Sequence, residues 1–158
     1  LLLPRSEVHH HPRDSLASRD WSDSRGGDPA AVSDEDRIVG GRFDEHPWGI
    51  TDATVVVEDR AAPMTKHLPA RFVVNDEHYQ LKDFSRGSLH VLARLDAARL
   101  DLNAPLVHRT DRDFPVAWTR TYGKGRVFYS TLGHHRELWD QAWMQTMYAE
   151  ALKWTLRL

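Results

Sequence analysis

Residues 113–135 read DFPVAWTRTYGKGRVFYSTLGHH, and this stretch decides the predicted fold. Its first segment alternates in polarity, with Phe114, Val116 and Trp118 on one face. Alternation of this kind is typical of a half-buried strand. The Gly-Lys-Gly at 123–125 favours a tight hairpin, because glycine adopts positive φ at little cost. We therefore predict two strands joined by a short turn.

The second segment, residues 126–132, carries coverable side chains on both faces. We therefore expect this strand to lie inside the sheet. It ends in Gly133, which is followed by His134 and His135. Open α/β sheets place their sites beyond the carboxyl ends of strands, so His134 is a candidate functional residue. We expect His135 to face elsewhere.

The length, net charge and hydropathy of the chain limit the classes of protein to which it can belong. The chain has 158 residues, enough for one domain with a modest core. Its net charge of −2 gives no electrostatic reason to expect a nucleic acid or an anionic membrane as partner. No stretch approaches the roughly 18 apolar residues that span a membrane. The run Leu1–Leu3 is too short for the core of a signal peptide, so we expect a cytoplasmic protein. Because the chain begins with leucine, we also expect that its true amino terminus is missing.

The first quarter of the chain differs from the rest. Residues 4–37 are rich in Arg, Asp, Ser, His and Pro, and they show no helical or strand period. Few apolar groups are present to offset the entropy of ordering. We expect an arm over residues 1–37, in which His9 to His11 form an exposed triplet, and a folded portion over residues 38–158.

Within the folded portion, apolar and β-branched runs predict strands, and a wide apolar stripe predicts a closing helix that packs on the sheet. Tryptophan and methionine in that stripe are expected to be core. The predicted elements are a loop at 42–49, strands at 54–58, 72–74 and 89–95, the hairpin, and a helix at 139–156.

Three motifs carry a family resemblance. They are Gly40-Gly41-x-Phe43-x-x-His46-Pro47, then Asp76-Glu77-x-Tyr79, then Pro-x-x-Trp with Tyr-Gly-Lys-Gly-Arg-Val-Phe-Tyr and Leu-Gly-His in the hairpin. In this order they resemble the ThuA-like (trehalose-utilisation) domain family. The resemblance implies an α/β, flavodoxin-like fold related to class I glutamine amidotransferases, and a role in carbohydrate utilisation. It covers residues 38–158 and lacks the first half of the family's sheet.

Two consequences follow for activity and assembly. An amidotransferase of the related fold needs a cysteine nucleophile, and this chain has no cysteine, so it does not hydrolyse glutamine in that way. A half-sheet would leave strand edges uncovered, which favours pairing into a homo-oligomer.

Four side chains are expected to converge, because each lies at the end of a predicted strand or in the loop after one: His46, Asp76, Glu77 and His134. Imidazoles and carboxylates together run acid–base chemistry or hold a divalent metal. We predict His134, Glu77 and His46 as catalytic residues, and the same three as ligands of one divalent metal ion. Neighbouring side chains in extended chain point oppositely. Glu77 is therefore expected to face the cleft and Asp76 to cap a turn.

The predicted ligand is a small-molecule carbohydrate, trehalose or a related keto-disaccharide. Trp48 in its loop is expected to stack on a sugar ring, with Tyr79 and Asp76 as further substrate contacts. Trp118 is expected to be core. The predicted reaction moves a proton at a sugar hydroxyl or at a carbon next to a carbonyl. Two alternatives stay open, namely a non-catalytic sugar-binding or interaction module and an inactive truncated fragment.

Overall fold

The computed structural model describes residues 32–158. The expectations for residues 1–31, including His9 to His11, lie outside this part. None of the helices between residues 32 and 158 has the length and apolar character that crossing a bilayer requires.

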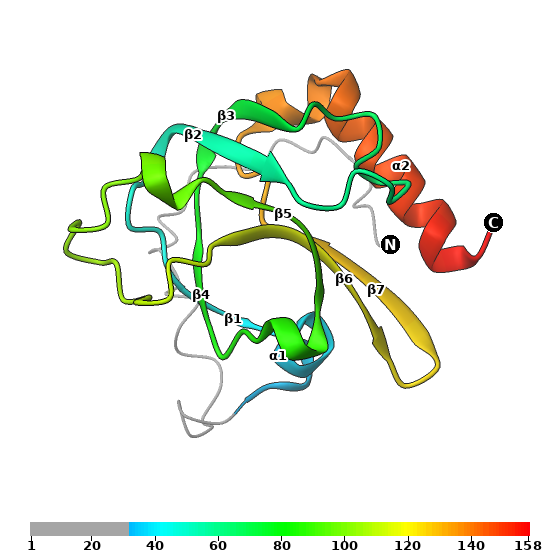
Figure 1. Cartoon of the computed structure of the whole chain (residues 1–158). Coiled ribbons are helices and arrows are strands. Elements are labelled where there is room, and N and C mark those ends of the chain that lie inside the picture. The colour runs from blue at the N-terminus through cyan, green and yellow to red at the C-terminus, as the bar shows by residue number, and fades with distance from the viewer. Residues whose placement is uncertain (1–31) are drawn as a thin grey trace, which may run out of the picture. The chain divides into compact units, whose positions relative to one another are not determined.

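Seven strands and two α-helices make up the described part (Figure 1). In chain order they are α1 (Asp34–Val39), β1 (Arg42–Glu45), β2 (Ile50–Val57), β3 (Arg71–Glu77), β4 (Gln80–Lys82), β5 (His90–Leu95), β6 (Pro115–Tyr122), β7 (Gly125–Ser130) and α2 (Ala142–Leu156). Three 3₁₀ turns join them, η2 (Arg86–Ser88), η3 (Ala97–Arg99) and η4 (Arg136–Asp140).

The strands form a curled five-stranded sheet of order β3-β2-β5-β6-β7 and a two-stranded sheet of β1 and β4. This arrangement with its flanking helix confirms the predicted α/β class. Each strand pair within residues 32–158 is antiparallel, whereas the flavodoxin-like fold that the resemblance implies is built on a mostly parallel sheet. Strand starts and strand ends therefore alternate along each rim of the sheet.

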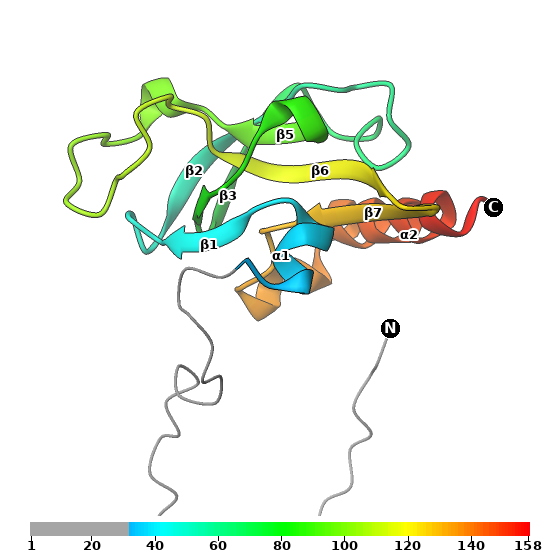
Figure 2. The same ribbon diagram turned by 90° about the horizontal axis from the view of Figure 1, so that it is seen from below.

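The core lies between the large sheet and α2, which runs beside β7 in both ribbon views (Figures 1 and 2). From α2, Met144, Met147 and Ala151 are buried in this core, as the predicted stripe requires. Phe128 of β7 meets Tyr148 of α2 edge to face, with ring centroids 5.6 Å apart.

The order of the hairpin strands differs from the prediction. β6 lies inside the sheet between β5 and β7, and its residues Pro115 to Thr119 are buried. Trp118 is fully buried there, as expected, and its Nε1 donates to the carbonyl of Val39 at 2.8 Å. In the described part β7 pairs with β6 alone and is partly exposed. The apolar side chains on both faces of the second hairpin strand therefore did not show that the first strand, β6, is the one with a partner strand on each side.

Two further corrections concern the start of the folded part. A capping box at Ser33 and Asp36 begins α1 inside the stretch expected to be an arm. Gly40 ends it with φ of 90°, where a Cβ atom would lie 2.6 Å from the Leu89 side chain. The expected loop at 42–49 forms β1 over its first half, because β4 supplies a partner strand from far along the chain.

Candidate functional site

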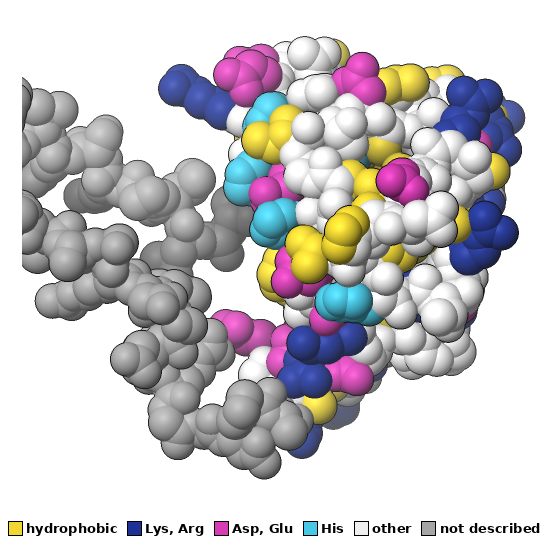
Figure 3. All heavy atoms as spheres, turned by 90° about the vertical axis from the view of Figure 1, so that its left-hand side faces the viewer, with side chains coloured by type: hydrophobic (Ala, Val, Ile, Leu, Met, Phe, Trp, Pro, Cys, Tyr) yellow, Lys and Arg dark blue, Asp and Glu magenta, His cyan; other side chains and the backbone are white. Residues whose placement is uncertain are grey.

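The end of β3, the loop after β1 and the turn after β7 meet at one rim of the molecule. Figure 3 shows one face of the molecule, on which histidine side chains lie among acidic and hydrophobic side chains. The structure brings His46, Glu77 and His134 close together at this rim. β3 and β7 are the two edge strands of the large sheet, and the successive antiparallel pairings between them leave their carboxyl ends on the same rim.

Glu77 is at the centre of this group. Its Oε1 lies 3.9 Å from Nδ1 of His46, and its Oε2 lies 3.3 Å from Nδ1 of His134. Its side chain is 19% exposed, whereas those of His46 and His134 are 45% and 46% exposed. A mostly covered carboxylate thus faces two imidazoles that solutes can reach.

Asp76 holds the turn that carries His134. It is fully buried, and its two oxygens accept hydrogen bonds from the backbone N–H groups of Gly133 and His135 at 2.7 and 2.9 Å. Gly133 has φ of 113°, and a Cβ atom there would lie 2.9 Å from Trp139, so the turn needs glycine. Asp76 is therefore the turn-fixing carboxylate that we expected, and its burial argues against the predicted substrate contact.

Tyr79 completes the group from the segment between β3 and β4. Its hydroxyl lies 3.2 Å from Nδ1 of His134. Burial, together with the hydrogen bond and the charge of Glu77, raises the pKa of Tyr79 to about 12, so the phenol is protonated at neutral pH. Phe43 packs against Tyr79 edge to face at 5.2 Å and stacks on His46 at 6.1 Å, which forms an aromatic wall beside the carboxylate.

This arrangement suits proton transfer. The carboxylate of Glu77 favours the tautomer of His134 in which Nδ1 carries the proton. Nε2 then has a free lone pair and is the nitrogen that does not face Glu77. A carboxylate that orients an imidazole in this way is a common feature of acid–base sites.

Two predicted residues lie outside the group. The Trp48 ring packs edge to face against buried Phe114 at 5.0 Å, and its Nε1 donates to the carbonyl of Asp101 at 2.9 Å. These contacts place Trp48 against the core and argue against the sugar-stacking role. His135 follows His134, with ring centroids 6.3 Å apart, and lines a separate groove, as its expected divergence implied.

The metal prediction is not supported by the arrangement of side chains. Within residues 32–158, no group of three or more His, Cys, Asp or Glu side chains is arranged to hold a metal ion. His46, Glu77 and His134 are close together, but they do not form the predicted ligand set.

Sequence reasoning missed a second polar cluster at β1 and β4. Asp44 accepts hydrogen bonds from Gln80 Nε2 at 2.6 Å and pairs with Nδ1 of His108 at 2.9 Å. Burial alone would raise the pKa of Asp44, but hydrogen bonds from His108 and Gln80 and the charges of His108 and Lys82 lower it overall. A lone glutamine between Tyr79 and Leu81 gave no signal of this role.

His78 was also missed. It is buried, and its Nε2 donates to the carbonyls of Thr51 and Val74 at 3.1 and 3.2 Å. Burial lowers the pKa of His78, which keeps the imidazole neutral. The side chain therefore ties β2 to β3.

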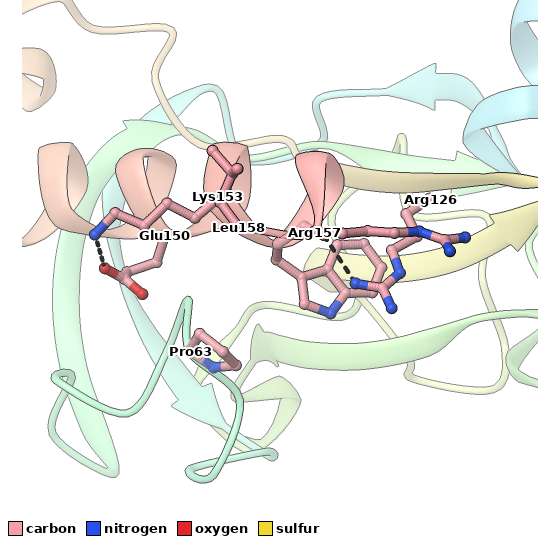
Figure 4. A pocket seen from close by; sticks show the side chains of 7 residues that line it. Pro63, Arg126, Glu150, Lys153, Arg157 and Leu158 are labelled. Atoms are coloured by element: carbon pink, nitrogen blue, oxygen red, sulfur yellow. Dashed lines mark hydrogen bonds and ion pairs between the residues drawn. The ribbon is translucent and has the colours of Figure 1, made fainter.

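A different cavity, of about 320 Å³, lies at the carboxyl end of α2 (Figure 4). Its basic side chains are already engaged. Arg126 donates to the carbonyl of Trp154 at 3.0 Å, and Lys153 pairs with Glu150 at 2.7 Å. The Arg126 contact satisfies a carbonyl at the end of a helix, where cations are stabilised by the helix dipole.

The family model for ThuA, described as trehalose utilisation, matches residues 29–155. The chain belongs to the ThuA family. The motifs at His46, Asp76 and His134 all lie inside the matched range.

Two solved structures are similar to this chain. A putative ThuA-like protein from Bacteroides uniformis is 26% identical with a TM-score of 0.61, and the match covers 76% of this chain and 49% of that one. Another, from Parabacteroides merdae, is 19% identical with a TM-score of 0.48, covering 73% and 40%. This ThuA chain thus spans about half the length of the first structure. The search of curated proteins found no match.

Proposed function

We infer that this ThuA-family chain acts on a carbohydrate, with His134 as the residue that moves a proton at the sugar. The observation that carries the proposal is the position of Glu77, 3.3 Å from Nδ1 of His134 on a turn that buried Asp76 fixes. The sugar class comes from the family description, trehalose utilisation.

The proposed chemistry takes place at a carbon next to a carbonyl. Nε2 of His134 takes the proton, and the electron pair of the broken C–H bond moves into the carbonyl to give an enolate. Glu77 holds the ring and stabilises the imidazolium that forms. Tyr79, protonated with its pKa raised to about 12, is a neutral hydrogen-bond donor to Glu77, and its hydroxyl lies 3.2 Å from Nδ1 of His134. His46 supplies a second imidazole on the other oxygen of Glu77.

A sugar-binding module without catalysis would need no converging titratable groups. The close approach of two imidazoles and a phenol to Glu77 therefore favours the catalytic proposal.

The test follows exchange of hydrogen for deuterium in a keto-derivative of trehalose dissolved in D₂O, measured by NMR with the full chain. His134→Ala and Glu77→Gln are each expected to slow exchange at least about 100-fold, the usual contribution of a positioned acid or base.

His90→Ala is the matched control, because His90 also pairs with a carboxylate, Asp59, at 2.7 Å, outside the proposed site. It should leave the exchange rate unchanged. Equal rates in the wild type and in the His134 and Glu77 variants would refute the proposal.

A further inference from the structure

Two imidazoles face Glu77 in nearly the same way. Nδ1 of His46 and Nδ1 of His134 lie 3.9 and 3.3 Å from its two oxygens, and the two side chains are 45% and 46% exposed. Exposure and the shared carboxylate therefore do not decide which imidazole carries its proton on Nδ1 and keeps a free lone pair on Nε2. A further contact is needed to make the two histidines different.

Tyr79 makes that contact with His134. Its hydroxyl forms a hydrogen bond of 3.2 Å with Nδ1 of His134. Within residues 32–158, no hydrogen bond joins the same hydroxyl to His46, whose ring instead stacks on Phe43 at 6.1 Å. The position of the ring proton of a histidine is set by the hydrogen bonds that its two nitrogens make. Tyr79 therefore distinguishes the two imidazoles.

The number of protons available gives the direction of the hydrogen bonds of Tyr79. Burial first, and then a hydrogen bond with Glu77 and the charge of that carboxylate, raise the pKa of Tyr79 to about 12. An ionised carboxylate only accepts, so Tyr79 donates its single proton to Glu77. The tyrosine oxygen then accepts from His134, which requires that the imidazole carry its proton on Nδ1.

A direct hydrogen bond from His134 to Glu77 is the alternative, and the distances disfavour it. Charge-assisted hydrogen bonds between nitrogen and a carboxylate measure about 2.7–2.9 Å, whereas Nδ1 of His134 lies 3.3 Å from Glu77. Two other pairs in the described part do reach direct hydrogen-bond distance, Asp59 with His90 at 2.7 Å and Asp44 with His108 at 2.9 Å. The Tyr79 hydroxyl thus provides at His134 the contact that a carboxylate provides in those pairs.

The Tyr79 side chain is itself held in place. Its ring meets Phe43 edge to face at 5.2 Å. Its neighbours in sequence, His78 and Gln80, are 1% and 0% exposed and are hydrogen-bonded to other segments. The backbone on both sides of Tyr79 is therefore fixed, and the hydroxyl keeps its position between the carboxylate and the imidazole.

We propose that Tyr79 is the positioning residue that makes His134, rather than His46, the base of this site. Its hydroxyl accepts from Nδ1 of His134 and donates to Glu77, so the carboxylate acts on His134 through the tyrosine. Nε2 of His134 is then the nitrogen that takes the proton, and the tyrosine keeps its own proton throughout. The catalytic part of this proposal rests on the proposed function, but the place of the Nδ1 proton is measured without a substrate.

The experiment determines the tautomer of each histidine from the ¹⁵N chemical shifts of its ring nitrogens in the full chain. It is done at about pH 9, above the usual histidine pKa of about 6.5, and spectra of His46→Ala and His134→Ala assign the two signals. In the wild type, His134 should carry its proton on Nδ1, whereas His46 should show a mixture of tautomers. This first result needs no change at Tyr79.

Tyr79→Phe removes the hydroxyl and keeps the ring that packs on Phe43. The ¹⁵N shifts of His134 should then resemble those of His46. Deuterium exchange in the keto-derivative should slow about tenfold, the effect of one lost hydrogen bond, with an unchanged KM. A higher KM at an unchanged maximal rate would make Tyr79 a substrate contact and overturn the proposal.

Tyr122→Phe is the matched control, since it removes the hydroxyl of a tyrosine that is 43% exposed and lies beside Arg120, outside the site. It should change neither the shifts of His134 nor the exchange rate. The same tautomer at His46 and His134 in the wild type, or an unchanged His134 in Tyr79→Phe, would refute the proposal. If the wild type shows no exchange but His134 loses its Nδ1 proton in Tyr79→Phe, the proposed function falls and the positioning of His134 by Tyr79 stands.

Discussion

Glu77 and Asp44 are both carboxylates next to histidine, yet their surroundings differ. Glu77 lies 3.9 Å from His46 and 3.3 Å from His134. Asp44 is held by shorter bonds, at 2.6 Å from Gln80 and 2.9 Å from His108, with Lys82 at 3.5 Å. These shorter and more numerous contacts indicate that Asp44 has a structural role and joins β1 to β4 and to the segment that carries His108. The looser contacts of Glu77 leave it able to respond to a change of charge on its imidazole.

The supports of the two clusters also differ. Behind Glu77, Asp76 binds the backbone of the Gly133–His135 turn through two N–H groups. Behind Asp44, Gln80 binds the backbone N–H groups of His108 and Arg109 at 2.8 and 3.0 Å. A buried side chain thus fixes a histidine-bearing segment in both places. This comparison predicts that only one of the two supports matters for activity.

Removal of Asp76 should have the largest effect. Asp76→Ala leaves two buried N–H groups without their acceptor, and the expected loss of unfolding free energy is about 3 kcal/mol. Sugar exchange should fall as it does in the His134 variant, because the turn loses its support. Asp76→Asn keeps one acceptor and should lose about half as much stability. Urea unfolding measures both, and equal stability of Asp76→Ala and wild type would contradict the assigned role.

Removal of Gln80 should have the next largest effect, on stability alone. Gln80→Ala leaves the N–H groups of His108 and Arg109 without their acceptor, at a cost of about 2 kcal/mol in urea unfolding. Sugar exchange should continue at the wild-type rate. Lys82→Ala, which removes a half-exposed partner of Asp44, is the control and should cost less than about 1 kcal/mol. A large loss of exchange in Gln80→Ala would place the Asp44 cluster in the active site.

The smallest effect should come from Asp44 and depend on pH. Its pKa in the folded chain is lowered, so its stabilisation is present above the unfolded value of about 3.9 and is lost as pH falls through the folded value. Asp44→Asn has no such titration. Wild type should therefore be more stable than the variant at pH 6, by about 0.5–1 kcal/mol, and this difference should shrink at pH 3. A difference that grows on acidification would show the opposite shift.

The sequence predicted those elements that show a regular spacing of apolar side chains or a family motif. The hairpin, the stripe of α2 and the strand ends at Glu77 and His134 all follow from periodicity or from family motifs. The division of labour between Asp76 and Glu77 followed from the alternation of side chains in extended chain.

Elsewhere, partners distant in sequence decided the outcome. β1 forms because β4 pairs with it, and β6 lies inside the sheet because β5 pairs with its second edge. The periodicity of a segment does not reveal its partner strands. The contacts of Trp48 with Phe114 and of Gln80 with His108 join residues far apart in the chain. No local pattern at Trp48 or Gln80 announces those contacts.

Asp76 binds its turn through the backbone N–H groups of Gly133 and His135. Neither hydrogen bond involves the imidazole of His134, which lies between them. The backbone at position 134 is therefore held in place whatever side chain it carries. A thiol, a carboxylate or an amine placed there would stand at the same spot beside Glu77, which makes this corner a place where new chemistry can be installed without rebuilding the scaffold.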